Sequence, residues 1–296
     1  DLEIARDIQQ AMLPRGLYSS GGLDAFGATR AANTVGGDFY DILPRPDGRV
    51  VIALGDVAGK GSPAALLMAI LLAMLRTLLD EGLDAEPLIN RLNVQISRHA
   101  PSSRFITLQF VNLDPATGDL VAVNAGHLPA LIRRRDGSFD RLSEGGIALG
   151  MFDNSQYTAQ RARLEPGDLL VLYSDGITEA ESPDGTPFDE EGLVSLISAH
   201  AGNPSLVDIG KAVIRGVEFH ARDVRFADDL TVLLARRTEN RDSGVGIGDW
   251  GLGTGDSAAG QPNVEGGLPP IPGDVSRLTA SEPAPSPQPP APAEAS

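Results

Sequence analysis

The order of the predicted strands and helices constrains the fold of this chain more than any single motif does. Apolar runs bounded by turn signals such as Asp-Pro and Asp-Gly predict many strands joined by short turns. Predicted helices interrupt them in two pairs, near residues 63–81 and 85–99 and near 189–200 and 205–221, and a last strand is predicted near 229–236. This order favours an α+β fold with mostly antiparallel sheets over βαβ alternation. Two sheets packed face to face with helices outside would bury all of these elements. The other strands are predicted over residues 23–32, 37–43, 49–56, 104–113, 119–125, 129–134, 157–163 and 168–174.

Composition divides the chain into three parts. Residues 1–14 are predicted to form a linker or regulatory helix, and residues 15–237 are long enough for one domain with its own core. Residues 238–296 are rich in Gly, Pro, Ser and Ala and lack apolar periodicity, so we expect them to be disordered. The proline-rich end of this tail could alternatively be a polyproline ligand for a partner's groove.

Charge and cysteine content exclude several classes of protein. The formal net charge of −16 argues against binding to nucleic acid or to an anionic membrane surface. The absence of cysteine excludes a cysteine-nucleophile phosphatase, a thiolate zinc site and disulfide bonds. The apolar run of residues 64–75 is shorter than the roughly 20 residues of a membrane span, so a buried helix is expected there. We expect a cytoplasmic protein, and because the sequence does not begin with Met, it can be a fragment of a longer one.

Four segments share one pattern, in which an aspartate beside glycine or a second acid adjoins an apolar run. Asp56 and Asp175 follow predicted strands, whereas Asp228 precedes one. Opposite ends of antiparallel neighbours meet at the same edge of a sheet, so these residues and Asp38 can converge although they are far apart in the chain. The segments are VGGDFYD (35–41), VVIALGDVAGKG (50–61), LLVLYSDGITEA (169–180) and FADDLTVLLA (226–235).

Converging carboxylates would favour a metal site. They repel one another, and their pKa values rise unless a cation lies between them. A carboxylate cluster without His or Cys suits hard ions such as Mg²⁺ or Mn²⁺. Glycines in the same turns let the backbone approach an ion; they are Gly36, Gly37, Gly59, Gly61 and Gly176. The alternative for any one segment is an ordinary Asp-Gly turn or a helix cap, and the occurrence of four such segments favours the metal site.

Six motifs, taken in order, resemble those of the SpoIIE/RsbU-type bacterial serine phosphatases of the metal-dependent type-2C superfamily. They are VGGDFYD, GDVAGKG, NAGHLPALI, ALGMF, YSDGITEA and ADDLTVLLAR, and the resemblance covers about residues 3–236. It implies a four-layer α-β-β-α sandwich of two antiparallel sheets with two Mn²⁺ or Mg²⁺ ions at one edge. Asp56 matches the aspartate that bridges both ions, and Val57 matches the residue that offers its carbonyl. The metal-binding aspartates of the family match Asp38, Asp56, Asp175 and Asp228, and Asp41 and Asp229 are candidates for orienting these ligands or binding a third ion.

The resemblance also implies a function. The family hydrolyses phosphoserine or phosphothreonine in a protein, with a water activated between two ions. Its usual substrate is a STAS-domain anti-anti-sigma factor, whose dephosphorylation frees a sigma factor. The alternative is a catalytically inactive phosphatase-like module that binds a signalling partner.

The amino-terminal helix resembles the family's linker to an upstream sensor or dimer module. Its apolar stripe of Ile4, Ile8 and Met12 therefore implies an activator acting through residues 1–14, and a homodimer. The alternative is ordinary packing of this stripe on the domain.

Two positions depart from the animal-type relatives. Their candidate general acid, a His shortly after the bridging Asp, is replaced by the turn that contains Lys60, and their phosphate-binding Arg is replaced near Asn33. Lys60 and His127 are candidates for a phosphate-binding or acid role. The alternatives are a solvated turn lysine and a histidine packed under a glycine turn.

Overall fold

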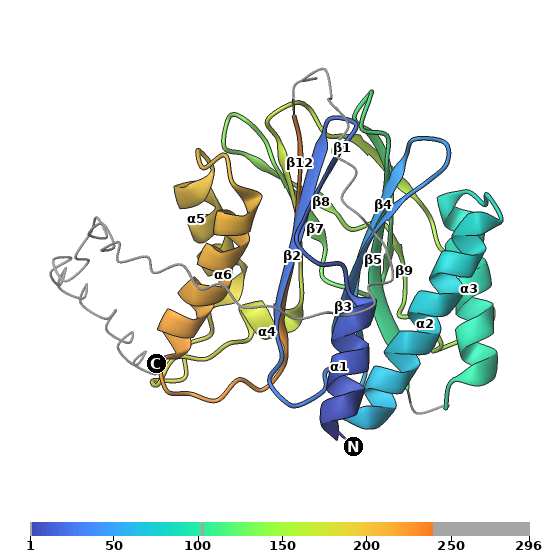
Figure 1. Ribbon diagram of the computed structural model, residues 1–296, viewed down its shortest axis with the longest axis horizontal. Helices are drawn as coiled ribbons and strands as arrows, with labels where there is room; N and C mark the ends of the chain where they lie inside the picture. The colour runs from blue at the N-terminus through green and yellow to red at the C-terminus, as the bar shows by residue number, and fades with distance from the viewer. Residues whose placement is uncertain (1, 102–103, 239–296) are drawn as a thin grey trace, which may run out of the picture. The chain divides into compact units, whose positions relative to one another are not determined.

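The computed structural model describes residues 2–101 and 104–238. The tail predicted for residues 238–296 lies outside this range apart from its first residue. The described residues form an α+β fold of two sheets stacked between two layers of helices (Figure 1). The predicted four-layer sandwich is therefore confirmed.

Each sheet is antiparallel throughout its main order of strands. Sheet I has the order β1-β2-β12-β11-β7-β8 and sheet II the order β10-β6-β5-β4-β3, while β9 joins β6 in parallel. Sheet I consists of β1 (Leu17–Ser20), β2 (Leu23–Arg30), β12 (Leu230–Arg237), β11 (Leu169–Tyr173), β7 (Ala130–Arg133) and β8 (Phe139–Leu142). Sheet II consists of β10 (Gln160–Arg163), β6 (Asp119–Ala125), β5 (Ile106–Leu113), β4 (Val50–Val57) and β3 (Phe39–Pro44), with β9 (Gly145–Gly146) beside β6.

The sandwich explains why β4 is an almost continuous apolar run. Val51 and Ala53 pack in the core beneath the helices of sheet II, whereas Ile52 and Leu54 pack in the core between the two sheets. A strand buried on both faces needs apolar residues at every position, not at alternate ones. Helices α2 (Ser62–Asp80) and α3 (Ala85–His99) cover sheet II, and α5 (Asp189–His200) and α6 (Leu206–Ala221) cover sheet I, with the single-turn α4 (Asp175–Thr178) beside them.

Among the helices in the described part of the chain, only α2 is long and apolar enough, by length and composition, to cross a membrane. A core helix of a globular domain can have the same length and composition. Met68, Leu71 and Leu75 of α2 are fully buried in the core on sheet II, as expected for the run at residues 64–75. Leu66 lies on the outer face and is 66% exposed.

Helix α1 (Leu2–Met12) lies beside α2 and contributes little to the core (Figure 1). Met12 packs against the core on sheet II, but Ile4 and Ile8 are 63% and 59% exposed. Ordinary packing on the domain therefore explains Met12, whereas Ile4 and Ile8 of the predicted stripe remain exposed to solvent.

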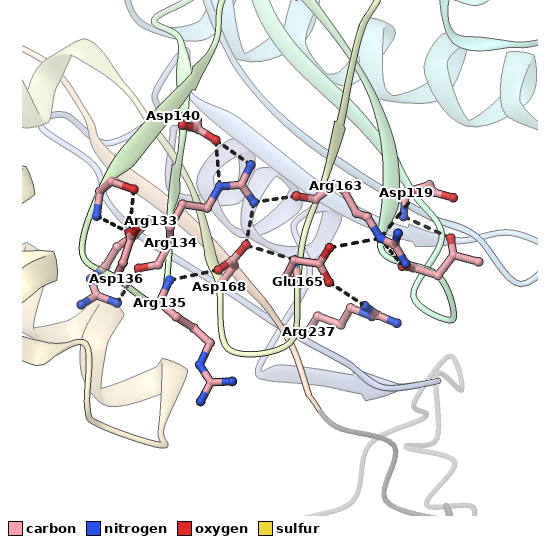
Figure 2. Close-up of polar contacts among 12 residues, drawn as sticks. Asp119, Arg133, Arg134, Arg135, Asp136, Asp140, Arg163, Glu165, Asp168 and Arg237 are labelled. Carbon is pink, nitrogen blue, oxygen red and sulfur yellow. Dashed lines mark hydrogen bonds and ion pairs between the residues drawn. The ribbon is translucent and has the colours of Figure 1, made fainter.

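An ionic network joins the two sheets at the start of β11, the end of that strand remote from Asp175 (Figure 2). Asp168 is buried and accepts hydrogen bonds from the Arg134 guanidinium at 2.6 Å and from the backbone N–H of Arg135 at 3.1 Å. The same guanidinium pairs with Asp140 and donates to the carbonyl oxygen of Arg163 in sheet II. A buried charge is stable only when it is paired and hydrogen-bonded, and Asp168 meets this condition.

Candidate metal centre

Sheet II brings Asp38 next to Asp56. The register pairs Phe39 at the start of β3 with Gly55 near the end of β4. Asp38 immediately precedes the first of these residues and Asp56 immediately follows the second. The two carboxylates therefore come from neighbouring strand ends, as the sequence predicted from antiparallel pairing.

Sheet I brings Asp175 next to the segment of Asp228 in the same way. Ser174 donates its backbone N–H to the carbonyl oxygen of Thr231 at 3.0 Å, and its hydroxyl donates to the carbonyl oxygen of Asp229. Gly37 of the loop before β3 donates its N–H to Asp229 at 3.1 Å, which joins the two sheets at this edge.

The carboxylates at this edge perturb one another. Burial raises the pKa of Asp56 to about 7, and the charges of Asp175, Asp228 and Asp229 contribute to the increase. Burial, and after it the charge of Asp56, raises the pKa of Asp38 well above its ordinary value. Burial and the charge of Asp228 also raise the pKa of Asp175. A cation at this edge would relieve the repulsion.

Two carboxylate oxygens here lack a partner within the described part of the chain. They are Oδ2 of Asp38 and Oδ1 of Asp175, and both are buried. Buried polar atoms without a hydrogen bond are rare in folded proteins because their desolvation is not repaid. A bound Mg²⁺ or Mn²⁺ prefers such oxygen donors, so the chemistry of these residues fits a hard divalent ion.

The side chains are not gathered around a single point. No group of three or more Asp, Glu, His or Cys side chains within residues 2–101 and 104–238 has the arrangement of a metal-binding cluster. The interactions among these aspartates that the structure supports are those of their charges.

Glycine is required by close approach at Gly36, Gly37 and Gly176 of this edge, and a Cβ atom on Gly36 would overlap the carboxylate of Asp229. A Cβ atom on Gly37 would lie 2.4 Å from Oδ1 of Asp56 and 2.8 Å from the carbonyl oxygen of Val57. A Cβ atom on Gly176 would lie 2.2 Å from the carbonyl oxygen of Asp229. Both distances to Gly37 involve predicted metal ligands, so this glycine leaves the two oxygens free to face the site.

Asp229 and Asp41 occupy different environments. Asp229 accepts hydrogen bonds from the backbone N–H of Ala32 at 2.8 Å and of Gly37 at 3.1 Å, so it holds the loop that leads to Asp38. Asp41 is buried on β3 and forms an ion pair with Arg76 of α2 at 2.8 Å. Asp229 therefore belongs to the carboxylate edge, whereas Asp41 ties β3 to α2.

The turn after β4 combines two left-handed glycines with Lys60. Gly59 and Gly61 have φ angles of 104° and 77°, which glycine adopts without steric cost. Lys60 donates to the carbonyl oxygen of Ala227 and lies 3.4 Å from Oδ2 of Asp228. The lysine therefore partly neutralises a predicted metal ligand, although its side chain is 56% exposed, as the alternative of a solvated turn lysine expects.

His127 is held by both of its ring nitrogens. Nε2 lies 3.1 Å from the carbonyl oxygen of Tyr173, and because a carbonyl oxygen can only accept, Nε2 carries the ring proton. Nδ1 then accepts a hydrogen bond from the Thr107 hydroxyl at 2.8 Å. Burial lowers the pKa of His127 to about 4, which keeps the ring neutral. Asn124 also bonds the backbone of His127 in both directions. This environment is that of a packed histidine that connects β5, the loop after β6, and β11.

Sequence reasoning missed two residues that contact the site loops. Gln9 of α1 donates from Nε2 to the carbonyl oxygen of Gly36 at 2.8 Å and accepts from its N–H at 3.1 Å. Arg104 donates to the carbonyl oxygen of Ala58 at 2.8 Å, and a Cβ on Gly59 would lie 2.2 Å from this guanidinium. Neither residue belongs to a local motif, so the sequence gives no signal for these contacts.

Comparison with known proteins identifies relatives of similar sequence and solved structures of similar fold. IcfG of Synechocystis is 29% identical over 265 residues, which cover 80% of this chain and 41% of IcfG. Phosphoserine phosphatase RsbU of Bacillus subtilis is 29% identical over 238 residues, which cover 80% of this chain and 70% of RsbU. The chain thus spans less than half of IcfG and about two thirds of RsbU. Among solved structures, the SiaA-PP2C domain of Pseudomonas aeruginosa has the same fold, with a TM-score of 0.68 at 23% identity over 80% of this chain and 96% of that one.

A family model shows which group the chain belongs to. The model of stage II sporulation protein E (SpoIIE) matches residues 46–238, which is more than half of the chain. The matched segment includes Asp56, Asp175 and Asp228 and leaves out Asp38. The chain belongs to the SpoIIE family.

Proposed function

We propose that this chain is a metal-dependent protein serine phosphatase that acts in sigma-factor regulation. The observation that carries the proposal is one edge of the sandwich, where the charges of Asp56, Asp38 and Asp175 perturb one another or their neighbours and where Oδ2 of Asp38 and Oδ1 of Asp175 are buried without a partner among the described residues. Four aspartates from both sheets, without His or Cys, form a donor set for Mg²⁺ or Mn²⁺. Membership of the SpoIIE family and the similarity to the phosphoserine phosphatase RsbU support phosphoserine as the substrate group.

The chain's own residues would hold the ions and organise the loops around them. Asp38, Asp56, Asp175 and Asp228 would bind two ions, with the carbonyl oxygen of Val57 as a further ligand. When bound, two such ions lower the pKa of water and neutralise phosphate oxygens. Because the pKa of Asp56 is about 7, this carboxyl group is partly protonated near neutral pH and would lose its proton when a cation binds.

Other residues would position this machinery. Asp229 fixes the backbone before Asp38 through its two N–H contacts. Lys60 is a candidate for contacting the substrate phosphate, because its ammonium group already lies beside Asp228. His127 has both ring nitrogens engaged, so a proton-donor role would require one of these bonds to break.

Hydrolysis of p-nitrophenyl phosphate with and without Mn²⁺ tests the proposal. We expect turnover that requires Mn²⁺ and falls at least about 100-fold in Asp56→Asn, since the substitution removes a ligand charge. Arg161→Gln on β10 is a matched surface control and should retain activity. Turnover that is indifferent to both Mn²⁺ and Asp56→Asn would reject the assignment.

A finer proposal concerns the natural substrate, which we infer to be a phosphorylated STAS-domain protein. The resemblance of the six motifs to the SpoIIE/RsbU type supports it. Incubating the chain and Mn²⁺ with a serine-phosphorylated STAS-domain protein should release inorganic phosphate. Release from an unrelated phosphoserine protein at the same rate would contradict this specificity.

One observation favours a second candidate, a phosphatase-like module that binds a partner without turnover. The described side chains do not form a preassembled metal cluster. Calorimetric titration with Mn²⁺ separates the two functions. Two bound ions per chain together with turnover would support the enzyme, whereas tight binding of a phosphoprotein without Mn²⁺ binding or turnover would support the binding module.

A further inference from the structure

An open hollow lies beside the carboxylate edge and has a different charge. It is formed where β2 leaves sheet I and where the segment after α6 leads into β12. Its volume is about 280 Å³. The residues that line it are Arg30, Ala31, Ala32, Arg222, Asp223, Val224, Arg225 and Phe226.

The lining is basic in a strongly acidic chain. Three arginines stand against a single aspartate, Asp223, whereas the whole chain has a formal net charge of −16. Cations concentrated in a concave site raise the local concentration of anionic ligands and strengthen their binding. The hollow therefore has the electrostatic character of an anion site.

Two of the guanidinium groups are held in place. Arg30 pairs with Glu218 of α6 at 2.5 Å and stacks over the ring of Phe226, with 4.9 Å between the guanidinium carbon and the ring centroid. Arg225 donates to the side-chain oxygen of Asn33 at 3.0 Å. Anchoring reduces the side-chain entropy that is lost when a ligand binds.

The third arginine, Arg222, has a guanidinium group without an ion-pair partner among the described residues. It follows the last residue of α6 with a φ angle of 51°, a left-handed conformation that is uncommon for residues other than glycine, asparagine and aspartate. Its side chain is exposed and has no hydrogen bond or ion pair with the residues that the structure describes. A charged group in this position is available to a ligand.

The hollow is continuous with the candidate metal centre through two backbone segments. Ala32, in its wall, donates its N–H to Asp229 at 2.8 Å. Phe226, in the opposite segment, is two residues before Asp228, whose cationic neighbour is Lys60. The guanidinium partners are Glu218 and Asn33, so the arginines of the hollow are not engaged in neutralising the carboxylate edge.

We propose that this hollow binds carboxylate side chains that flank the phosphoserine of the protein substrate. The inference rests on the proposed function and adds a substrate class to it, phosphoserine in an acidic segment. Arg222 and Arg225 would each form an ion pair with a substrate carboxylate. The phosphoserine itself would lie at the aspartates, outside the hollow.

Two phosphopeptides test the proposal, one with glutamate on both sides of the phosphoserine and one with glutamine in the same places. The measured quantity is the ratio of their kcat/KM values. An exposed ion pair contributes at most about a fivefold effect, so two pairs predict that wild type prefers the glutamate peptide by about 2- to 25-fold. The preference should fall as salt is raised from about 0.05 to 0.5 M.

The double variant Arg222→Asn/Arg225→Gln should reduce this ratio to about 1. Asparagine carries the same Cβ as the arginine that already occupies φ 51° and ψ −112° at position 222, and glutamine retains a polar group toward Asn33, so both changes are chosen to preserve the fold. Arg161→Gln removes one exposed arginine from β10, far from the hollow in the sheet order, and should leave the ratio unchanged. A wild type without preference, or a double variant that keeps it, would overturn the proposal.

Binding measured by fluorescence anisotropy keeps this test independent of turnover. The unphosphorylated glutamate peptide should compete with its labelled phosphorylated form in wild type, and about 2- to 25-fold less well in the double variant. Absence of competition would show that the hollow does not bind carboxylates and would overturn the inference. If wild type shows this competition but no Mn²⁺-dependent hydrolysis, the proposed function fails while the acidic-segment site stands.

Discussion

Replacement of Gly37 by alanine tests whether the carboxylate edge is a working site. The added Cβ would lie 2.4 Å from Oδ1 of Asp56 and 2.8 Å from the carbonyl oxygen of Val57. Ordinary carbon–oxygen contacts are about 3.3 Å or longer, so one or both oxygens must move by roughly 0.5–1 Å. Because a displacement of about 1 Å at a reacting centre can cost about 100-fold in rate, we expect a loss of that order in kcat. Overpacking should also lower the free energy of unfolding by about 1–3 kcal/mol.

The assay compares Gly37→Ala with Gly48→Ala. Gly48 has a φ angle of 86° and no atom within 4 Å of its would-be Cβ, so its replacement imposes backbone strain without a clash at the site. This control should lose about 1–2 kcal/mol of stability and keep its Mn²⁺ affinity and kcat. Manganese binding by calorimetry and hydrolysis of p-nitrophenyl phosphate measure both effects. If Gly37→Ala retains the Mn²⁺ affinity and kcat of Gly48→Ala, the assignment of Asp56 and Val57 as ligands is refuted.

Three further predictions concern contacts away from the ligands. Gln9→Ala removes both hydrogen bonds to Gly36 and should lower kcat on p-nitrophenyl phosphate several-fold. Replacing the exposed Gln10 by alanine should not lower kcat, and an equal loss of kcat in the two variants would contradict a role for Gln9. Asp168→Ala removes the buried partner of Arg134, which keeps its pair with Asp140, and should cost about 1–3 kcal/mol in denaturant unfolding. A loss below 1 kcal/mol would show that the network in Figure 2 contributes little. Folding lowers the pKa of His127 from 6.5 to about 4, so it favours the neutral ring, and the stability from this group is complete above pH 6.5 and is lost as pH falls toward 4. The shift corresponds to about 3 kcal/mol, and a stability difference between wild type and His127→Gln that does not change with pH would contradict it.

The long elements could be predicted from sequence because their burial leaves a strong pattern. The predicted strand 49–56 corresponds to β4, Val50–Val57, and the predicted helix 85–99 has the bounds of α3. The elements that were missed have two to four residues, namely β1, β8, β9 and α4, whereas the four-residue β7 and β10 fall within the predicted strands 129–134 and 157–163. Such short segments show no period of 2 or 3.6 residues, and their pairing is decided by neighbours that are distant in sequence.

The candidate site was predictable only in part, for a similar reason. The aspartates are recognisable because each stands beside a glycine or a second acid at the end of an apolar run. The contacts of Gln9 and Arg104 depend on tertiary structure, which places α1 beside the loop before β3 and the start of β5 beside the turn after β4. Polar residues on an exposed helix face or before a strand look alike whether or not they reach such a loop.

Because the four aspartates are divided between the two sheets, the packing of the sheets against each other and the binding of metal ions depend on one another. Asp38 and Asp56 come from one layer and Asp175 and Asp228 from the other, so neither layer alone contains all four proposed ligands. An ion bound by all four aspartates would cross-link the two sheets. Any ligand that binds the native state and not the unfolded chain stabilises the native state, and sliding one layer over the other would separate the halves of the site. A signal that shifts one sheet relative to the other by a small amount would therefore change the activity without direct contact with any of the four aspartates.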